Sequence, residues 1–381
     1  MSAPGLVVFG EDWGAHPSST QHIVARLAAE RDVVWINSIG LRRPRLTARD
    51  VKRIVDKLMR MARPAHGLRA ESAPRPPRVR TLDPRAVPWP GARLAAALNR
   101  ALVGAQARAA MTRAGLERPI LWTSLPSALD VVDAVPHRAL VYYCGDDFSS
   151  LAGVDHAPVA RMEARLAARA DLILAASEPL AARFPAHKTM LAPHGVDYDL
   201  FATPAPRAPD LPPRPEGGAI AGFYGALADW IDVDMLARAA RALPRWTFVF
   251  VGPVHAPAEA LARLPNVRLL GPRPHAALPS YAQHWDVSLL PFRDNAQIRA
   301  CNPLKLREYL AAGSPIAATD FPTLRPYADL VCIAQTPQDF QNAIEQAAQD
   351  AQRNATRRAR VQEESWDARA QAIARALDAL P

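Results

Sequence analysis

The sequence predicts two α/β domains, each built on a doubly wound sheet of parallel strands. Short apolar runs alternate with amphipathic helical segments along the whole chain, and this alternation is typical of βαβ units. A chain of 381 residues is long enough for two such domains, because one domain usually takes about 100–200 residues. Residues 203–218 hold six prolines and show no apolar periodicity, which indicates a linker between the two domains.

The first predicted domain covers residues 1–202. Its six expected strands are short and apolar, as buried parallel strands are: 6–9, 33–37, 120–123, 139–144, 172–175 and 189–192. Its expected helices are 19–30, 48–62, 93–114 and 158–169.

The alternation restarts in a second predicted domain at 219–364. Its expected strands are 219–224, 247–251, 267–270, 287–291, 316–319 and 330–333. Its expected helices are 233–243, 256–264, 275–284, 302–312 and a segment from 338 onward. An amphipathic helix at 365–381 is expected to cross back and cap the first domain.

The composition argues against a metal-bound or disulfide-stapled protein. Cys144, Cys301 and Cys332 lie far apart, without a C-x-x-C motif or a histidine at ligand spacing. This usage favours a reducing cytoplasm. The first residues include no basic leader, and no apolar run approaches the ~18 residues of a spanning helix. We therefore expect neither a signal peptide nor an integral membrane protein.

Positive charge is concentrated in residues 41–113. This region holds 18 Lys and Arg against four acids, a net charge of +14 in a chain whose total is +9. A block of this kind attracts an anionic bilayer, a phosphorylated lipid or a nucleic acid, and the alternative is a solvated arginine-rich surface. Trp89 is the one aromatic residue among these arginines, which argues against nucleic acid. A helix near 51–61 places apolar and basic side chains together, an arrangement suited to docking on the inner face of the cytoplasmic membrane.

One segment of the second domain has the pattern of an anion-binding site. The predicted strand 287–291 is followed by a loop, 293–301, at its carboxyl end, where open α/β sheets bind ligands. The next helix is expected to begin with Asn302 as N-cap and Pro303 in its first position, and to end before Gly313. The unpaired amides and positive dipole end of such a helix favour a diphosphate.

Two charged residues of this helix fit a nucleotide. Lys305 adds a full positive charge beside the first turn. Glu308 lies one turn further along, and a carboxylate there accepts hydrogen bonds from two vicinal ribose hydroxyls. The alternative is that Lys305 and Glu308 form only a surface ion pair on an ordinary helix.

The run from Asn302 to Thr319, NPLKLREYLAAGSPIAAT, resembles the donor-binding segment of family 4, or group 1, bacterial polysaccharide glycosyltransferases. In that family a Pro-Leu-Lys-x-x-Glu-Tyr-x-Ala-x-Gly-x-Pro run binds the nucleotide sugar, and the Glu at the position of Glu308 holds the ribose. Further similar stretches are 193–197 with Phe201, 222–230 and 247–253. The resemblance covers about residues 190 to 330, and the N-terminal half matches in architecture only.

The resemblance implies the GT-B fold, in which two Rossmann-like domains enclose a cleft that binds a UDP- or GDP-sugar without an obligatory metal. The implied donor-binding residues are Gly225, Gly252, Arg293, Asn302, Pro303, Leu304, Lys305 and Glu308. This chain departs from the family at Ala300, where a second Glu usually touches the donor sugar, and it lacks an Arg/Lys pair after Gly225. We therefore expect Lys305 to carry more of the phosphate charge, with help from Arg293 or Arg299.

A catalytic base is expected at the carboxyl ends of the first domain's strands. Asp146 and Asp147 follow the predicted strand 139–144, and adjacent acids push one pKa upward. They resemble an Asp-Asp stretch of exopolysaccharide transferases, including glucuronosyltransferases of xanthan type. We expect Asp146 to be the base and Asp147 the second candidate; the alternative is that either caps the next helix. His16, with Asp12 and His22, is a further candidate near the first strand.

These features predict an enzyme that moves a hexosyl group from a nucleoside-diphosphate sugar to a glycan or lipid-linked acceptor during cell-surface polysaccharide or glycolipid synthesis. One alternative is a sugar-nucleotide 2-epimerase of the same fold. Another is a degenerate subunit that binds nucleotide without catalysis, which Ala300 favours. The absence of a G-x-G-x-x-G motif after the first strand argues against a dinucleotide-dependent dehydrogenase.

Overall fold

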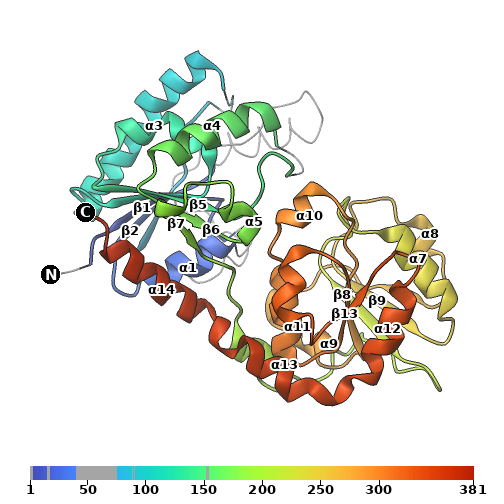
Figure 1. The fold of residues 1–381 in the computed structure, drawn as a ribbon. Helices are drawn as coiled ribbons and strands as arrows, with labels where there is room; N and C mark the ends of the chain where they lie inside the picture. The colour runs from blue at the N-terminus through green and yellow to red at the C-terminus, as the bar shows by residue number, and fades with distance from the viewer. Residues whose placement is uncertain (1–2, 15–17, 40–74, 88, 90, 152–153) are drawn as a thin grey trace. The chain divides into compact units, whose positions relative to one another are not determined.

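The computed structural model describes residues 3–14, 18–39, 75–87, 89, 91–151 and 154–381. The chain divides into two compact units, one formed by Met1–Pro193 with Arg369–Pro381 and the other by His194–Ala368. Each unit contains one parallel sheet with helices packed on it (Figure 1). The predicted pair of parallel α/β sheets is thus confirmed.

In the described part of the first unit, the sheet has seven strands in the order β3-β2-β1-β4-β5-β6-β7. The strands are β1 (Leu6–Phe9), β2 (Val33–Ile36), β3 (Val79–Leu82), β4 (Ile120–Thr123), β5 (Ala139–Cys144), β6 (Leu172–Ala175) and β7 (Thr189–Leu191). Leu6 pairs with Val33 of β2 on one side and with Ile120 of β4 on the other. The strand order therefore reverses at β1, and ligands of doubly wound sheets bind at the carboxyl ends beside such a point.

Strand β3 is the one element of this sheet that sequence reasoning missed, because six strands were expected. It is an edge strand whose Val79 pairs with Val33 and is buried, whereas Arg80 is exposed. With one buried position and an arginine-rich surround, the strand has no apolar run to detect.

The helices of the first unit cover both faces of its sheet. Those in the described residues are α1 (Ser19–Leu27), α3 (Arg93–Ala114), α4 (His156–Arg169), α5 (Glu178–Ala181) and the greater part of α14 (Trp366–Asp378). Figure 1 shows α3 and α4 on one face and α1 and α14 on the other. The buried Arg31 forms an ion pair of 2.5 Å with Asp378, which fastens the end of α14 to this unit. The predicted helix 48–62 lies outside the described residues.

The second unit has a six-stranded sheet in the order β10-β9-β8-β11-β12-β13. Its strands are β8 (Ile220–Tyr224), β9 (Thr247–Val251), β10 (Val267–Leu269), β11 (Val287–Leu290), β12 (Ile316–Thr319) and β13 (Cys332–Ala334). Its helices are α6 (Tyr198–Ala202), α7 (Val233–Ala242), α8 (Glu259–Ala262), α9 (Pro279–Ala282), α10 (Ala296–Ala300), α11 (Leu304–Ala312), α12 (Phe340–Gln349) and α13 (Asn354–Val361). In Figure 1, α7, α8 and α12 cover one face of the sheet, and α9, α11 and α13 cover the other.

The proline-rich segment 203–218, expected to be a linker, lies within the second unit. Ala208 and Leu211 are buried in its apolar core, and the Ala208 amide donates to the Ser280 carbonyl at 3.0 Å. The chain enters this unit at His194, so Phe201 belongs to its core as well. The prolines therefore shape a loop that packs on the unit, and they do not separate two bodies.

Candidate functional site

Two glycines at the carboxyl edge of the second sheet bring three segments into contact. Gly225 follows β8 with φ 128°, and Gly252 follows β9 with φ 151°, backbone conformations that side chains disfavour. A Cβ on Gly252 would lie 2.1 Å from the Gly225 carbonyl oxygen. A Cβ on Gly225 would lie 2.4 Å from Cε of Lys305. The two predicted glycines and Lys305 thus form one tightly packed group, in which a larger residue does not fit.

The start of α11 differs in detail from the prediction. The N-cap residue is Pro303, and Leu304 is the first helical residue, whereas Asn302 was expected to be the cap. Asn302 is buried, and its Oδ1 accepts a hydrogen bond from the guanidinium of Arg307 instead. Arg307 in turn pairs with Glu364, with 2.7 Å between Nε and Oε2. Asn302 therefore anchors the first turn from inside the unit.

Lys305 brings a positive charge to this edge of the sheet. Its side chain is half-buried, and its ammonium lies 5.7 Å from the centre of the Phe223 ring. Burial lowers the pKa of Lys305, against the opposing charge of Glu308. Among the described residues, Lys305 forms no ion pair. A cation beside a helix N-terminus and glycine-lined loops is suited to a phosphate group.

Glu308 is held by two hydrogen bonds from outside its own helix. Only 7% of the residue is exposed. Its Oε2 accepts from the Tyr224 hydroxyl at 2.7 Å, and its Oε1 lies 2.7 Å from Nε2 of His275. In the described part of the chain, the alternative of a surface Lys305–Glu308 ion pair is not seen.

His275 and Tyr224 are the residues of this site that sequence reasoning missed. They lie 33 and 84 positions from Glu308, so no helical spacing connects them with it. The His275 ring also packs edge-on against Phe201, with 5.4 Å between ring centres. Burial alone would lower the pKa of His275, but the hydrogen bond and charge of Glu308, with Asp197, outweigh it and raise that pKa.

The segment 293–301 was expected to be a loop, but it contains helix α10 with Asn295 as N-cap, and its two arginines do not join this group. Arg293 donates from Nε to the Ile231 carbonyl at 3.1 Å, and Arg299 pairs with the exposed Asp294 at 2.6 Å. Both line a cavity of about 380 Å³ beside Thr319, near the carboxyl ends of β11 to β13. Neither Lys305 nor Glu308 is among the residues that line this cavity.

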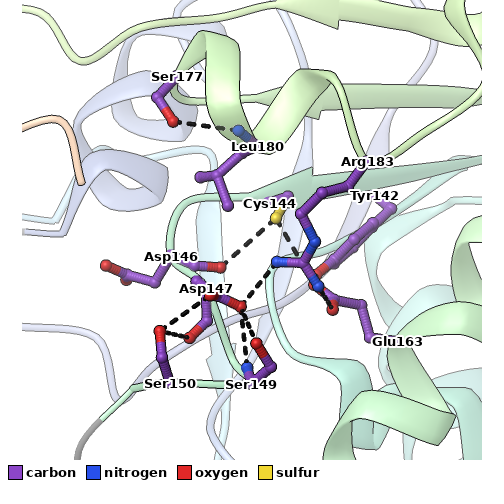
Figure 2. A network of polar contacts seen from close by, with 10 residues as sticks. All are labelled: Tyr142, Cys144, Asp146, Asp147, Ser149, Ser150, Glu163, Ser177, Leu180 and Arg183. Carbon is purple, nitrogen blue, oxygen red and sulfur yellow. Dashed lines mark hydrogen bonds and ion pairs between the residues drawn. The ribbon is translucent and has the colours of Figure 1, made fainter. Parts of the chain in front are cut away.

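In the first unit, Asp147 closes the turn that follows β5. Its carboxylate accepts from the Ser149 amide at 3.0 Å, the Ser149 hydroxyl at 2.6 Å and the Ser150 hydroxyl at 2.9 Å (Figure 2). Arg183 adds an ion pair of 2.7 Å. Burial would raise the pKa of Asp147, but these hydrogen bonds and the arginine lower it. The next helix, α4, has Asp155 at its N-cap, so Asp147 stabilises a turn and the helix-capping alternative is not seen for it.

The Asp146 carboxylate points away from that network (Figure 2). Loss of hydration, together with the nearby charges of Glu11 and Asp147, raises the pKa of Asp146 to about 6. The residue nevertheless keeps access to solvent. The two neighbouring carboxylates after β5 therefore differ. Asp147 is held by hydrogen bonds and has a lowered pKa, whereas Asp146 is turned outward and can accept a proton near neutral pH.

A buried network beneath Asp147 fixes the loop. Glu163 of α4 is 2% exposed and accepts from the Tyr142 hydroxyl at 2.6 Å. It also pairs with Nη2 of Arg183 at 2.8 Å, while Nη1 of the same arginine reaches Asp147 (Figure 2). Arg183 thus joins α4 to the turn after β5.

The loop after β1 supplies another carboxylate to this edge. Glu11 accepts from the Ser18 hydroxyl at 3.0 Å, and burial raises its pKa. Asp12 accepts from the Ser38 amide at 3.2 Å, and His22 lies in the first turns of α1. His16 lies outside the described residues. Glu11 was not among the predicted candidates, although its place directly after a strand end would have marked it.

Comparison with known proteins points to one family. Residues 218–350 match the model of the group 1 glycosyl transferases. TuaH of Bacillus subtilis (strain 168), which is named as a glycosyltransferase of teichuronic acid biosynthesis, is 29% identical over 252 residues. That alignment covers 60% of this chain and 63% of TuaH.

Solved structures of low sequence identity share the fold. Sucrose-phosphate synthase from Thermosynechococcus elongatus has a TM-score of 0.69 at 17% identity, covering 98% of each chain. Anabaena HepE in complex with UDP and glucose has a TM-score of 0.66 at 16% identity, covering 99% of this chain and 100% of its own. The chain thus has the GT-B fold, and the predicted resemblance to the group 1 glycosyltransferases is confirmed.

Proposed function

We propose that this chain transfers a hexosyl group from a UDP- or GDP-sugar to a glycan or lipid-linked acceptor in the synthesis of a cell-surface polysaccharide or glycolipid. The observation that carries the proposal is the group of Lys305, Gly225, Gly252 and Glu308 at one sheet edge. The match of residues 218–350 to group 1 glycosyltransferases, the UDP complexes of HepE and the name of TuaH support it.

On the donor side, each residue has a separate task. Lys305 and the first amides of α11 neutralise the diphosphate, whose charge grows as it departs from the sugar. Gly225 leaves room for the side chain of Lys305, and Gly252 lets the loop after β9 lie against the Gly225 carbonyl beside the proposed phosphate site. Glu308 accepts hydrogen bonds from the ribose hydroxyls. Asn302 and Pro303 set the start of α11, and Leu304 supplies its first helical amide.

On the acceptor side, Asp146 is the proposed base. With a pKa of about 6, its carboxyl group is largely ionised at pH 7 and takes the proton of the attacking hydroxyl. The oxygen then forms the new glycosidic bond to the anomeric carbon, and the nucleoside diphosphate leaves with the bonding electrons. Asp147 keeps the supporting position that its hydrogen bonds give it.

We further propose that the protein acts in the cytoplasm and docks on an anionic membrane. Helix α3 exposes Leu94 by 82%, Leu98 by 51% and Leu102 by 48%, four residues apart along one face. The helix holds four arginines and no acid, so this apolar face complements a negatively charged lipid surface. In the described part of the chain, no helix combines the length and apolarity needed to cross a bilayer. The docking that we propose is peripheral.

Vesicle flotation tests the membrane proposal. The chain should float with phosphatidylglycerol-containing vesicles and stay unbound with neutral phosphatidylcholine vesicles. Replacing Leu94, Leu98 and Leu102 together by Ser should abolish flotation without changing nucleotide affinity. Equal binding of both vesicle types, or of wild type and variant, would contradict docking by this face.

Transfer itself is tested in two steps. Thermal-shift screening against UDP, GDP, ADP and TDP identifies the base, because a ligand that binds the native state raises its stability. Incubation of the matching sugar nucleotides with glycan and polyprenyl-linked acceptors then measures transfer. A 2-epimerase would instead isomerise the sugar nucleotide without acceptor, and a degenerate subunit would bind nucleotide with no turnover. Either result would overturn the proposed function.

A further inference from the structure

The carboxylate of Glu308 has half of its hydrogen-bonding capacity occupied by protein. A carboxylate offers about four lone-pair positions, two on each oxygen. Tyr224 takes one position on Oε2, and His275 takes one on Oε1. Within the described residues no other hydrogen bond reaches this carboxylate, so one position remains on each oxygen, and the two hydroxyls of a vicinal diol require the same number.

We propose that His275 is a positioning residue of the donor site: with Tyr224, it orients the Glu308 carboxylate so that each oxygen keeps one lone pair for a ribose hydroxyl. This inference rests on the proposed function, because it assumes that Glu308 binds the nucleotide ribose. His275 itself need not touch the nucleotide. It acts through Glu308, and its loss affects the ribose contact first.

The charged groups around His275 indicate that its own charge also contributes to this role. The groups that face it are Glu308 from α11 and Asp197 from the segment before α6, and Tyr224 reaches it through Glu308. Lys305 is a second cation near Glu308. A protonated His275 therefore offsets the Glu308 charge, which would otherwise repel the nucleotide diphosphate. Its side chain is 32% exposed, so the imidazole can exchange protons with solvent.

The opposite reading is that the His275–Glu308 bond closes the site and must break when the nucleotide binds. The two hypotheses predict opposite changes in nucleotide affinity when the His275 side chain is removed. If His275 positions Glu308, removal of its side chain weakens nucleotide binding. If it blocks Glu308, removal strengthens binding.

The experiment compares UDP with 2′-deoxy-UDP, and GDP with 2′-deoxy-GDP, by titration calorimetry on the full chain. The variants are His275→Ala, His275→Gln, Glu308→Ala and the control His284→Ala. His284 is a half-buried histidine of the same unit that bonds to the Ala205 carbonyl at 2.7 Å, away from Glu308. Gln keeps a neutral donor near the position of Nε2.

We expect wild type and His284→Ala to prefer the ribonucleotide about tenfold, the size of one hydrogen bond to a charged group. His275→Ala should lose most of that preference and should bind the ribonucleotide more weakly. His275→Gln should recover the preference. In wild type, affinity should fall as the pH rises through the titration of His275, and the glutamine variant should lack this step.

The outcomes test two points separately: whether Glu308 binds the nucleotide, and whether His275 positions Glu308. If wild type binds no nucleoside diphosphate, or if Glu308→Ala binds as well as wild type, the proposed function fails. If Glu308→Ala loses the preference while His275→Ala keeps it, the donor site stands and the role of His275 is overturned. Tighter binding by His275→Ala would also overturn it, in favour of a blocking contact.

Discussion

Glu308 in the second unit and Asp146 in the first are both carboxylates at carboxyl ends of parallel sheets, yet their environments are opposite. Glu308 is almost wholly buried and accepts from Tyr224 and His275. Asp146 turns away from the hydrogen bonds that hold Asp147, and its pKa is raised to about 6. A carboxylate fixed by donors is suited to bind a ligand of constant shape, whereas one with a raised pKa is suited to move a proton. The contrast predicts that replacing Asp146 lowers the rate of transfer, whereas replacing Glu308 lowers the affinity for the nucleotide.

The largest effect is expected from Asp146→Asn. Removal of a general base usually lowers a rate by about 10²–10⁴-fold. We expect kcat to fall in this range while UDP affinity stays within about twofold, and the wild-type rate should decline as the pH drops below about 6. Asp147→Asn is the matched control and should lose stability more than rate. Equal kcat losses in both variants would remove the distinction between the two aspartates.

Next in size is the effect of Lys305→Ala on nucleotide binding. A charge-assisted contact to phosphate contributes about 1.5–3 kcal/mol, so affinity for UDP should fall about 10–100-fold. Arg299→Ala, which removes the exposed partner of Asp294, should leave that affinity unchanged. Calorimetric titration of both variants gives the comparison. A greater loss for Arg299 would move the phosphate site to the cavity near Thr319.

A smaller effect is expected for Arg183→Met, which leaves the buried Glu163 without its cation. Because Arg183 is 34% exposed, we expect a loss of about 2 kcal/mol, below the value for a fully buried pair. Unfolding by urea measures it. The double variant with Glu163→Gln should recover part of the loss, because the uncompensated charge is then gone. Additive losses would show that Arg183 and Glu163 do not depend on each other.

The smallest effect is the pH dependence that His275 gives to stability. Its folded-state pKa is raised, so its contribution is full below the unfolded value of about 6.5 and is lost as the pH rises through the folded-state pKa. The difference in melting temperature between wild type and His275→Gln should therefore be larger at pH 6 than at pH 8.5. A difference that grows with pH would contradict the raised pKa.

The strands of the second unit were predicted more fully than those of the first, because all six of its strands were expected and β3 of the first unit was not. Two residues of the sequence predict the ends of helix α11: Pro303 near its start and Gly313 just past its end, where the backbone has φ 79°. Strand β3 has no such signal, because an edge strand needs only one apolar face. The cap assigned to Asn302 was wrong because Arg307, five residues on, takes up its side-chain oxygen.

Contacts between residues that lie far apart in the sequence could not be predicted from it. His275 and Tyr224 reach Glu308 only because β8 and the segment after β10 end at the same sheet edge as the start of α11. Arg183 likewise meets Asp147 through tertiary packing. The proline-rich segment 203–218 was expected to be a linker because prolines restrict the backbone equally in a linker and in a loop that packs on a core.

The central claim is that Glu308 holds the ribose of a nucleotide whose phosphates lie by Lys305. Titration of UDP and GDP into wild type, Glu308→Ala and the surface control Glu345→Ala, an exposed residue of α12, tests it directly. We predict that Glu308→Ala loses about tenfold or more in affinity for the nucleotide that wild type binds, while Glu345→Ala is unchanged. Equal affinity in all three proteins would contradict the account.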